Sequence, residues 1–483
     1  MSEPRVWGMP PGADFPRALA ASLCAGVPPD APEALARVTL YLNSARMLRA
    51  VRAAFAERPT GFLPRLRVVT EAAEDPAVPL GPSVPPLRRR LELSVLIARL
   101  LDAQPDLAPR AALHDLADSL ADLLDEMEGE GVTPQRIADL DVSDHSAHWA
   151  RTRAFLMLVA PLFDGEAAGP DARLRRAAAA LAARWALQAP PGPVYVAGST
   201  ASRGATAALM LAVARLPQGG LILPGFDFDM PADAWVALDD PLTGEDHPQF
   251  RFARLLAALD LTPADVRPWP AASPDPARNR VLSLALRPAP VTDRWRAEGP
   301  ALPTLPEAMA GVSLIEAPGP RAEANAIALA LRDAAAAGQT AALLSPDRTL
   351  ARMVTAALDR WGIVPDDGGG EPLALTAPGR FLRMVAELCT APPAAEAVIA
   401  LQTSAGRFGR GARGASEGSS RVRAAGAAAR PGLSHGRCPA RLGRGTRLGR
   451  LGRRRARHGG GDRGGRRRAA ARGHGRPPGA GRA

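Results

Sequence analysis

The chain contains no lysine, because all 60 of the residues counted as Lys or Arg are arginines. This excludes a P-loop lysine on a nucleotide phosphate, a Schiff-base lysine and a lysine general base. Aromatic residues make up only 4% of the 483 positions, and cysteine occurs three times, at Cys24, Cys389 and Cys438. The cysteines form no C-x-x-C pair, which fits a reducing compartment and excludes a cysteine-ligated zinc or iron–sulfur site within this chain.

Long hydrophobic runs are also missing. The longest, residues 204–214, has 11 residues between Arg203 and Arg215, whereas a membrane-spanning helix needs about 18 or more. The apolar run at 18–29 follows Glu3 and Asp14 rather than a basic segment, so we interpret it as a buried helix and not a signal peptide. We expect a soluble cytoplasmic protein with no membrane partner.

The positive charge is concentrated at the carboxyl end. The net charge of +11 divides into −9 for residues 1–403 and +20 for residues 404–483, where 22 arginines face only Glu417 and Asp462. Such a segment could be an Arg/Gly-rich arm that binds nucleic acid through charge. It could equally be the out-of-frame translation of a GC-rich gene.

The composition of this tail favours the second explanation. Arg, Gly, Ala and Pro, whose codons begin with two G or C bases, supply 62 of its 80 residues. Back-translation from Gln402 with permitted codons, shifted by one base, gives a text beginning KHPLAASG, with lysines, tryptophans and balanced charge. We therefore predict a frameshift at about Leu401 and expect residues 403–483 to be a disordered, out-of-frame tail, because so few apolar side chains cannot offset the entropy of ordering.

The rest of the chain alternates short apolar runs with longer amphipathic patterns, which is typical of α/β folds with a parallel sheet. Strands are expected at 37–43, 61–70, 194–197, 219–224, 312–316 and 340–345, and Ser44 is a candidate N-cap. The predicted order is two parallel-sheet units with an inserted helical subdomain. The first unit is predicted at 1–85 and 191–262, with the helical insertion at 86–190 between its two halves. A Pro-rich connector follows at 263–306, and the second unit is predicted to start at 307–402.

A phosphate-loop pattern follows the first apolar run but is degenerate. Gly8 and Gly12 lie four apart, yet no Gly-Lys-Ser/Thr follows, Pro10 and Pro11 remove two backbone donors, and Asp14 would repel phosphate. We expect no ATP binding here.

The loop at 198–204 is more promising, because it lies between a buried strand and a helix start, where backbone dipoles favour anions. Its polar side chains could hold a DNA phosphate: Ser199, Thr200, Ser202 and Arg203. A polar loop that only caps its helix explains the same residues equally well.

Two groups of acids resemble catalytic or metal sites. Asp227 and Asp229 follow an apolar run as in a Walker B strand, but without a lysine partner we favour an acidic loop. A second group, Asp141, Asp144, His145 and His148, lacks the H-E-x-x-H spacing and reads as a solvated helix start. With no G-x-S-x-G either, we predict no catalytic residue and no metal site.

Six segments, in this order, resemble the AddB family, the non-motor subunits of AddAB-type helicase–nucleases. They are VWGMPPGADFPRALAASL, VTLYLNSARMLRAVRAAF, LADSLADLLDEMEGEGV, VYVAGSTASRGATAALM, LPQGGLILPGFDFD and TAALLSPDRTLARMVTAALDRWGI. The resemblance covers about residues 1–402.

The resemblance implies two RecA-like, helicase-superfamily units that bind DNA ends without hydrolysing ATP, in double-strand break repair by homologous recombination. It implies an AddA-type partner that carries ATP and Mg²⁺, and an iron–sulfur cluster in a carboxy-terminal nuclease domain that nothing here matches. Weak DNA contacts are expected through Arg46, Arg49 and Arg203. The alternatives are a standalone Arg/Gly-tailed nucleic-acid-binding protein and a Rossmann-like nucleotide-binding enzyme.

Overall fold

The computed structural model describes residues 3–390, except for 59–60, 79, 82–83, 104, 106–107, 140–168 and 371. The chain divides into two compact units, one ending at Ile315 and the other beginning at Glu316. The candidate cluster of Asp141, Asp144, His145 and His148 and the tail at 403–483 lie outside the described residues, so the expectations for both stay predictions.

The first unit is built on a sheet of six parallel strands in the order β3-β2-β4-β5-β1-β6. This confirms the expected α/β class with a parallel sheet. Ser44 caps the helix that follows β2, accepting a hydrogen bond from the backbone N–H of Met47 at 3.2 Å, as predicted. The strands are β1 (Val6–Gly8), β2 (Thr39–Leu42), β3 (Arg65–Val68), β4 (Val194–Ala197), β5 (Gly219–Leu223) and β6 (Arg267–Pro268).

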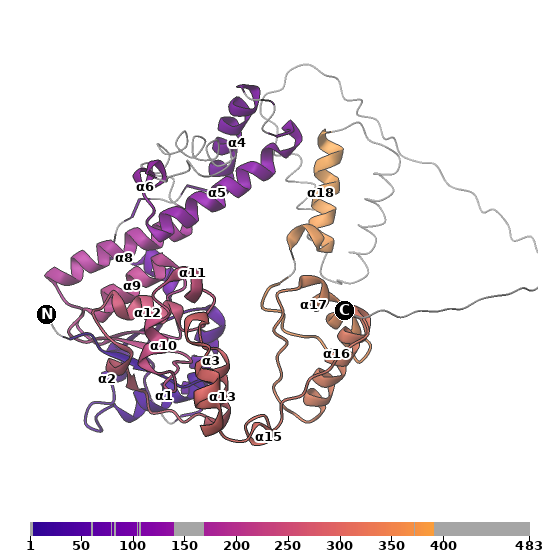
Figure 1. Cartoon of the computed structure of the whole chain (residues 1–483). Helices are drawn as coiled ribbons and strands as arrows, with labels where there is room; N and C mark the ends of the chain where they lie inside the picture. The colour runs from indigo at the N-terminus through magenta and orange to yellow at the C-terminus, as the bar shows by residue number, and fades with distance from the viewer. Residues whose placement is uncertain are drawn as a thin grey trace, which may run out of the picture. The chain divides into compact units, whose positions relative to one another are not determined.

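Helices cover both faces of this sheet, because successive side chains of a strand point to opposite sides. Leu40 and Leu42 pack with α1 and α3 on one face, whereas Tyr41 between them packs with α8 and α9 on the other. Figure 1 shows α8 and α9 on one side of the strands and α1 on the other. The helices are α1 (Phe15–Ala25), α2 (Ala34–Arg37), α3 (Ala45–Ala56), α8 (Pro170–Leu187), α9 (Gly204–Ala214), α10 (Ala232–Val236), α11 (Pro241–Gly244) and α12 (Phe250–Ala257).

The described residues of the segment predicted as a helical insertion, 86–190, contribute to two separate cores. Helices α4 (Pro86–Ala103), α5 (Leu113–Glu130) and α6 (Pro134–Ala138) share a small core of their own. Helix α8 contacts α5, where the Ala172 N–H donates to Oδ1 of Asp125 at 3.3 Å. Its residues Leu174, Ala178 and Leu181, however, belong to the core of the sheet. Its alanine-rich apolar stripe allows close packing on α9, which makes α8 part of the parallel-sheet fold.

The Pro-rich stretch at 263–306 also differs from the connector that the sequence suggests. It supplies β6, which pairs with β1 through Trp7 and Arg267, and Trp269 is 8% exposed in the core. Helices α13 (Pro276–Ala285), α14 (Arg294–Glu298) and α15 (Leu305–Ala308) follow within the first unit. Proline lies in the first turn of α13 and α15, a position that proline fits well.

The second unit contains α16 (Pro320–Ala336), α17 (Arg348–Asp359) and α18 (Ala377–Thr390). The segments predicted as strands at 312–316 and 340–345 carry no strand assignment and no strand pairing. A strand requires a neighbour that accepts and donates its ladder hydrogen bonds, and among the described residues neither segment has one. Among the described residues, the structure therefore shows one parallel sheet, and the predicted second sheet is not shown.

Among the described residues, no helix combines the length and apolar character that crossing a bilayer requires.

Candidate functional site

The candidate site lies at the carboxyl edge of the sheet, where parallel strands gather the loops that follow them. This is the edge at which open α/β sheets bind ligands. The loops after β1, β2, β4 and β5 all meet here, and β1 lies between β5 and β6. The degenerate phosphate loop, the 198–204 loop and the Asp227–Asp229 loop are therefore neighbours in one region.

The loop after β1 is filled by the protein's own side chains. A Cβ at Gly8 would lie 2.7 Å from Cβ of Phe226 and 2.9 Å from Cζ of Phe228, so only glycine allows these rings to pack where a phosphate would approach. Gly12 takes φ +83°, a left-handed conformation that glycine adopts freely. The side chain of Asp14 accepts the N–H of Arg17 at 3.3 Å, placing a carboxylate at the start of α1.

The far side of this loop is also occupied. The Pro11 carbonyl accepts hydrogen bonds from Nδ2 of Asn279 at 3.1 Å and from Oγ of Ser273 at 3.3 Å. A phosphate cradle needs open backbone N–H groups at a helix start, whereas Pro10 and Pro11 have none and the Met9 N–H already donates to the Leu223 carbonyl at 2.9 Å. Gly8 and Gly12 shape a closed turn.

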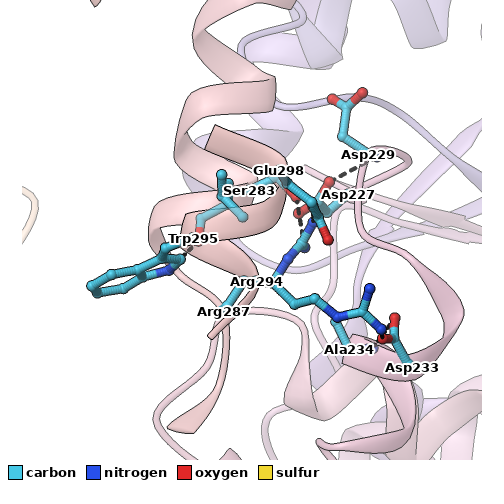
Figure 2. A network of polar contacts seen from close by, with 10 residues as sticks. Asp227, Asp229, Asp233, Ala234, Ser283, Arg287, Arg294, Trp295 and Glu298 are labelled. Atoms are coloured by element: carbon cyan, nitrogen blue, oxygen red, sulfur yellow. Dashed lines mark hydrogen bonds and ion pairs between the residues drawn. The ribbon is translucent and has the colours of Figure 1, made fainter. Parts of the chain in front are cut away.

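The acidic loop after β5 is held by a network of polar contacts (Figure 2). Oδ1 of Asp227 accepts the Asp229 N–H at 2.9 Å, and Nε2 of Gln249 donates to the Gly225 carbonyl at 2.9 Å. Burial raises the pKa of Asp229, and the adjacent Asp227 carboxylate raises it further. Burial lowers the pKa of His247, whose Nδ1 accepts the Gln249 N–H at 3.1 Å.

Arg287 is the buried cation of this network, with a side chain that is 3% exposed. It donates to Oε2 of Glu298 and to Oγ of Ser283, both at 3.2 Å. A second pair in Figure 2, Arg294 with Asp233, is solvent-exposed by comparison, at 45% and 40%. Within the part of the chain that the structure describes, no group of three or more His, Cys, Asp or Glu side chains is placed to hold a metal ion.

The 198–204 loop after β4 is held by local and long-range contacts. Ser199 is buried, and its Oγ accepts the Ala201 N–H at 3.3 Å. Arg203 donates to Oδ2 of Asp171 at 2.7 Å. Thr200 and Ser202 are exposed. Ser199 therefore stabilises a turn inside the loop, no side chain of the loop caps α9, and two hydroxyls are within reach of solvent or a ligand.

The start of α9 carries an anion supplied by the protein itself. Oε1 of Glu130, at the end of α5, accepts the Gly204 N–H at 2.6 Å. The helix N-terminus thus attracts a carboxylate, as its dipole favours, and a phosphate would have to displace Glu130 to bind there.

Arg46 and Arg49 are exposed on α3, whose Met47 lies beside Gly198 at the same edge.

A hollow of about 370 Å³ beside this helix start contains two arginines that the sequence analysis missed. Arg251 and Arg254 of α12 line it together with Gly204 and Glu130. The Arg251 guanidinium lies 5.5 Å from the Phe250 ring centroid and pairs with Glu245 at 3.2 Å. The sequence feature that could have identified these two arginines is their spacing at i and i+3. This spacing puts them on one face of an otherwise apolar helix.

Comparisons with known proteins yield no match, either to a protein-family model or to a curated protein.

Proposed function

We propose that the first unit is the DNA-binding, helicase-like but ATPase-inactive part of an AddB-type subunit. With an AddA-type helicase–nuclease partner it would act in double-strand break repair by homologous recombination. The observation that carries the proposal is the filled carboxyl edge of the sheet: the β1 turn is closed by Phe226, Phe228 and Asp14 where a motor subunit needs an open phosphate cradle. The same closure counts against a Rossmann-like nucleotide-binding enzyme.

Support for DNA binding comes from the arginines beside α9. The start of α9 already attracts the Glu130 carboxylate. Arg203 directly precedes this helix, and Arg251 and Arg254 line the hollow beside it. The net charge of −9 over residues 1–403 means that a phosphate contact must depend on these local cations rather than on the charge of the whole unit. Thr200 and Ser202 add exposed hydroxyl donors at the same edge.

The six-stranded parallel sheet is consistent with a RecA-like unit, and α16 with α17 would begin a second one. The family's iron–sulfur cluster does not fit this chain, because such clusters generally use four cysteines and the sequence has three. ATP does not fit the β1 turn. We therefore assign both groups to other parts of the complex and derive no step through them.

Charge reversal at the α9 hollow tests the proposal, in a chain ending at residue 403 so that the basic tail does not mask the result. We expect Arg203→Glu and Arg254→Glu each to weaken duplex binding about tenfold, and to lower the slope of log K against log salt by about 1 for each lost phosphate contact. Fluorescence anisotropy over a salt series measures both quantities.

Two further variants serve as controls. Arg184→Glu makes the same charge change near the end of α8, which runs directly into the start of β4 and so lies at the opposite edge. It should leave the slope unchanged. Glu130→Gln removes the competing negative charge at Gly204 and should strengthen DNA binding about two- to fivefold. This factor corresponds to the interaction free energy of one charge with a helix N-terminus, about 0.3–1 kcal/mol. An unchanged slope in both arginine variants would refute the assignment of this edge.

A further inference from the structure

Trp361 of the second unit has two arginine side chains packed against its indole ring, which is 38% exposed. The guanidinium carbon of Arg332, on α16, lies 5.0 Å from the ring centroid. That of Arg360, the C-cap of α17, lies 5.1 Å from the same centroid. Nη2 of Arg360 also donates to Oδ1 of Asn325 on α16 at 2.7 Å. These four residues, here called the Trp361 cluster, therefore form one continuous patch across two helices.

The positive charge of the Trp361 cluster is only partly neutralised. Arg332 pairs with Asp333 at 2.8 Å, but the Asp333 side chain is 69% exposed, and water screens an ion pair in such a position. Arg360 donates to the neutral oxygens of Asn325 and Ala357 and forms no ion pair among the described residues. Capping of α17 explains the contact with Ala357, but it does not require a second guanidinium from α16. Two guanidinium groups gathered at one ring favour an external anion such as a phosphate.

We propose that the Trp361 cluster binds single-stranded nucleic acid, with phosphates on Arg332 and Arg360 and an unpaired base stacked on the exposed indole. Proteins that bind single strands combine cations that follow the backbone with aromatic rings that stack on the bases. A duplex keeps its base faces inside its own stack, and an acidic peptide offers charge without a planar ring. The site shares no residue with the hollow beside α9, so it does not depend on the DNA contacts proposed there.

Photocrosslinking of the full chain tests the proposal. The probe is an oligothymidylate of about 12 nucleotides with one thymine replaced by 5-iodouracil, in about 0.3 M salt to weaken binding by the basic tail. Trypsin releases residues 361–380, in which Trp361 is the sole aromatic residue. We expect an adduct on this peptide, and at least about fivefold less of it when the oligonucleotide is annealed to its complement, because base faces are then covered.

Substitution of the two arginines tests the phosphate contacts. Arg332→Gln and Arg360→Gln should each lower the adduct yield at least about threefold, since each removes one charge and leaves Trp361 in place. Arg360→Gln also removes a trypsin site, so its adduct is expected on residues 353–380, in which Trp361 is again the sole aromatic residue. Arg383→Gln is the control, because Arg383 is an exposed arginine on α18 of the same unit, and it should leave the yield within about twofold of the wild type.

Three outcomes would overturn the proposal. The first is the absence of an adduct on the Trp361 peptide, and the second is a yield that neither arginine substitution changes. The third is equal protection by poly-glutamate and by unlabelled oligothymidylate at the same number of charges, which would indicate a site for acidic peptides instead.

Discussion

Deleting residues 404–483 is expected to lower the non-specific affinity for DNA by about two orders of magnitude or more at 0.1 M salt. The segment carries +20 of charge, and without it the remaining chain carries −9. Neutralising six to ten phosphates makes binding fall by about 10³–10⁵ between 50 and 200 mM salt, so a tail with 22 arginines can dominate the affinity of the whole chain. Electrophoretic mobility shifts with random-sequence duplex measure the loss.

The same deletion should leave the melting temperature of the first unit within about 2 °C of the full chain. The tail's composition offers too few apolar side chains to contribute to a core, and a change of 1 kcal/mol would move the melting temperature by about 2–4 °C in a domain of this size. A large drop would mean that the tail belongs to the fold, and the frameshift interpretation would then be wrong.

Replacing Glu298 by glutamine is expected to destabilise the first unit by about 2–3 kcal/mol. The substitution keeps the size of the side chain but removes the carboxylate with which the Arg287 cation, 3% exposed, forms an ion pair, and leaves only the electrostatic interaction with Asp229. Removing one partner of a buried ion pair commonly costs about 3–5 kcal/mol. Glu298 is itself 33% exposed, so water compensates part of that loss. Urea unfolding followed by tryptophan fluorescence measures the change in free energy.

The exposed pair in Figure 2 provides a matched control. Asp233→Asn makes the same carboxylate-to-amide change opposite Arg294, in a pair that is about half exposed, and should cost less than about 1 kcal/mol. Adding Arg287→Met to Glu298→Gln should recover part of the lost stability, because no buried charge is then left unpaired. Equal effects of the two amide substitutions would mean that burial of Arg287 does not control this network.

The sequence predicted those parts of the first unit that depend on local pattern. The apolar runs of β2, β4 and β5 are long enough to identify buried strands, and Ser44 caps its helix through a contact only three residues away. The expectation that the β1 turn binds no ATP came from two prolines and an aspartate in the sequence, whereas the packing of Phe226 and Phe228 at Gly8 was not predicted.

The remainder depended on contacts between distant segments. Glu130 reaches Gly204 across 74 positions, and no local pattern pairs an acid at one helix end with the start of another helix. The two-residue strand β6 is too short for any periodicity, and it forms because Gly8 and Trp7 offer it an open edge. In the second unit the strand pattern was present, but pairing needs a neighbour that the described residues do not provide.

The preference for DNA ends tests the central claim most directly. The chain ending at residue 403 is titrated with a duplex that has open ends and with the same duplex closed by hairpins at both ends, at one salt concentration. The proposed function predicts binding at least about fivefold tighter to the open duplex, or about 1 kcal/mol, and loss of this preference in Arg203→Glu and Arg254→Glu. Equal affinity for the two duplexes, or a preference that survives both substitutions, would contradict it.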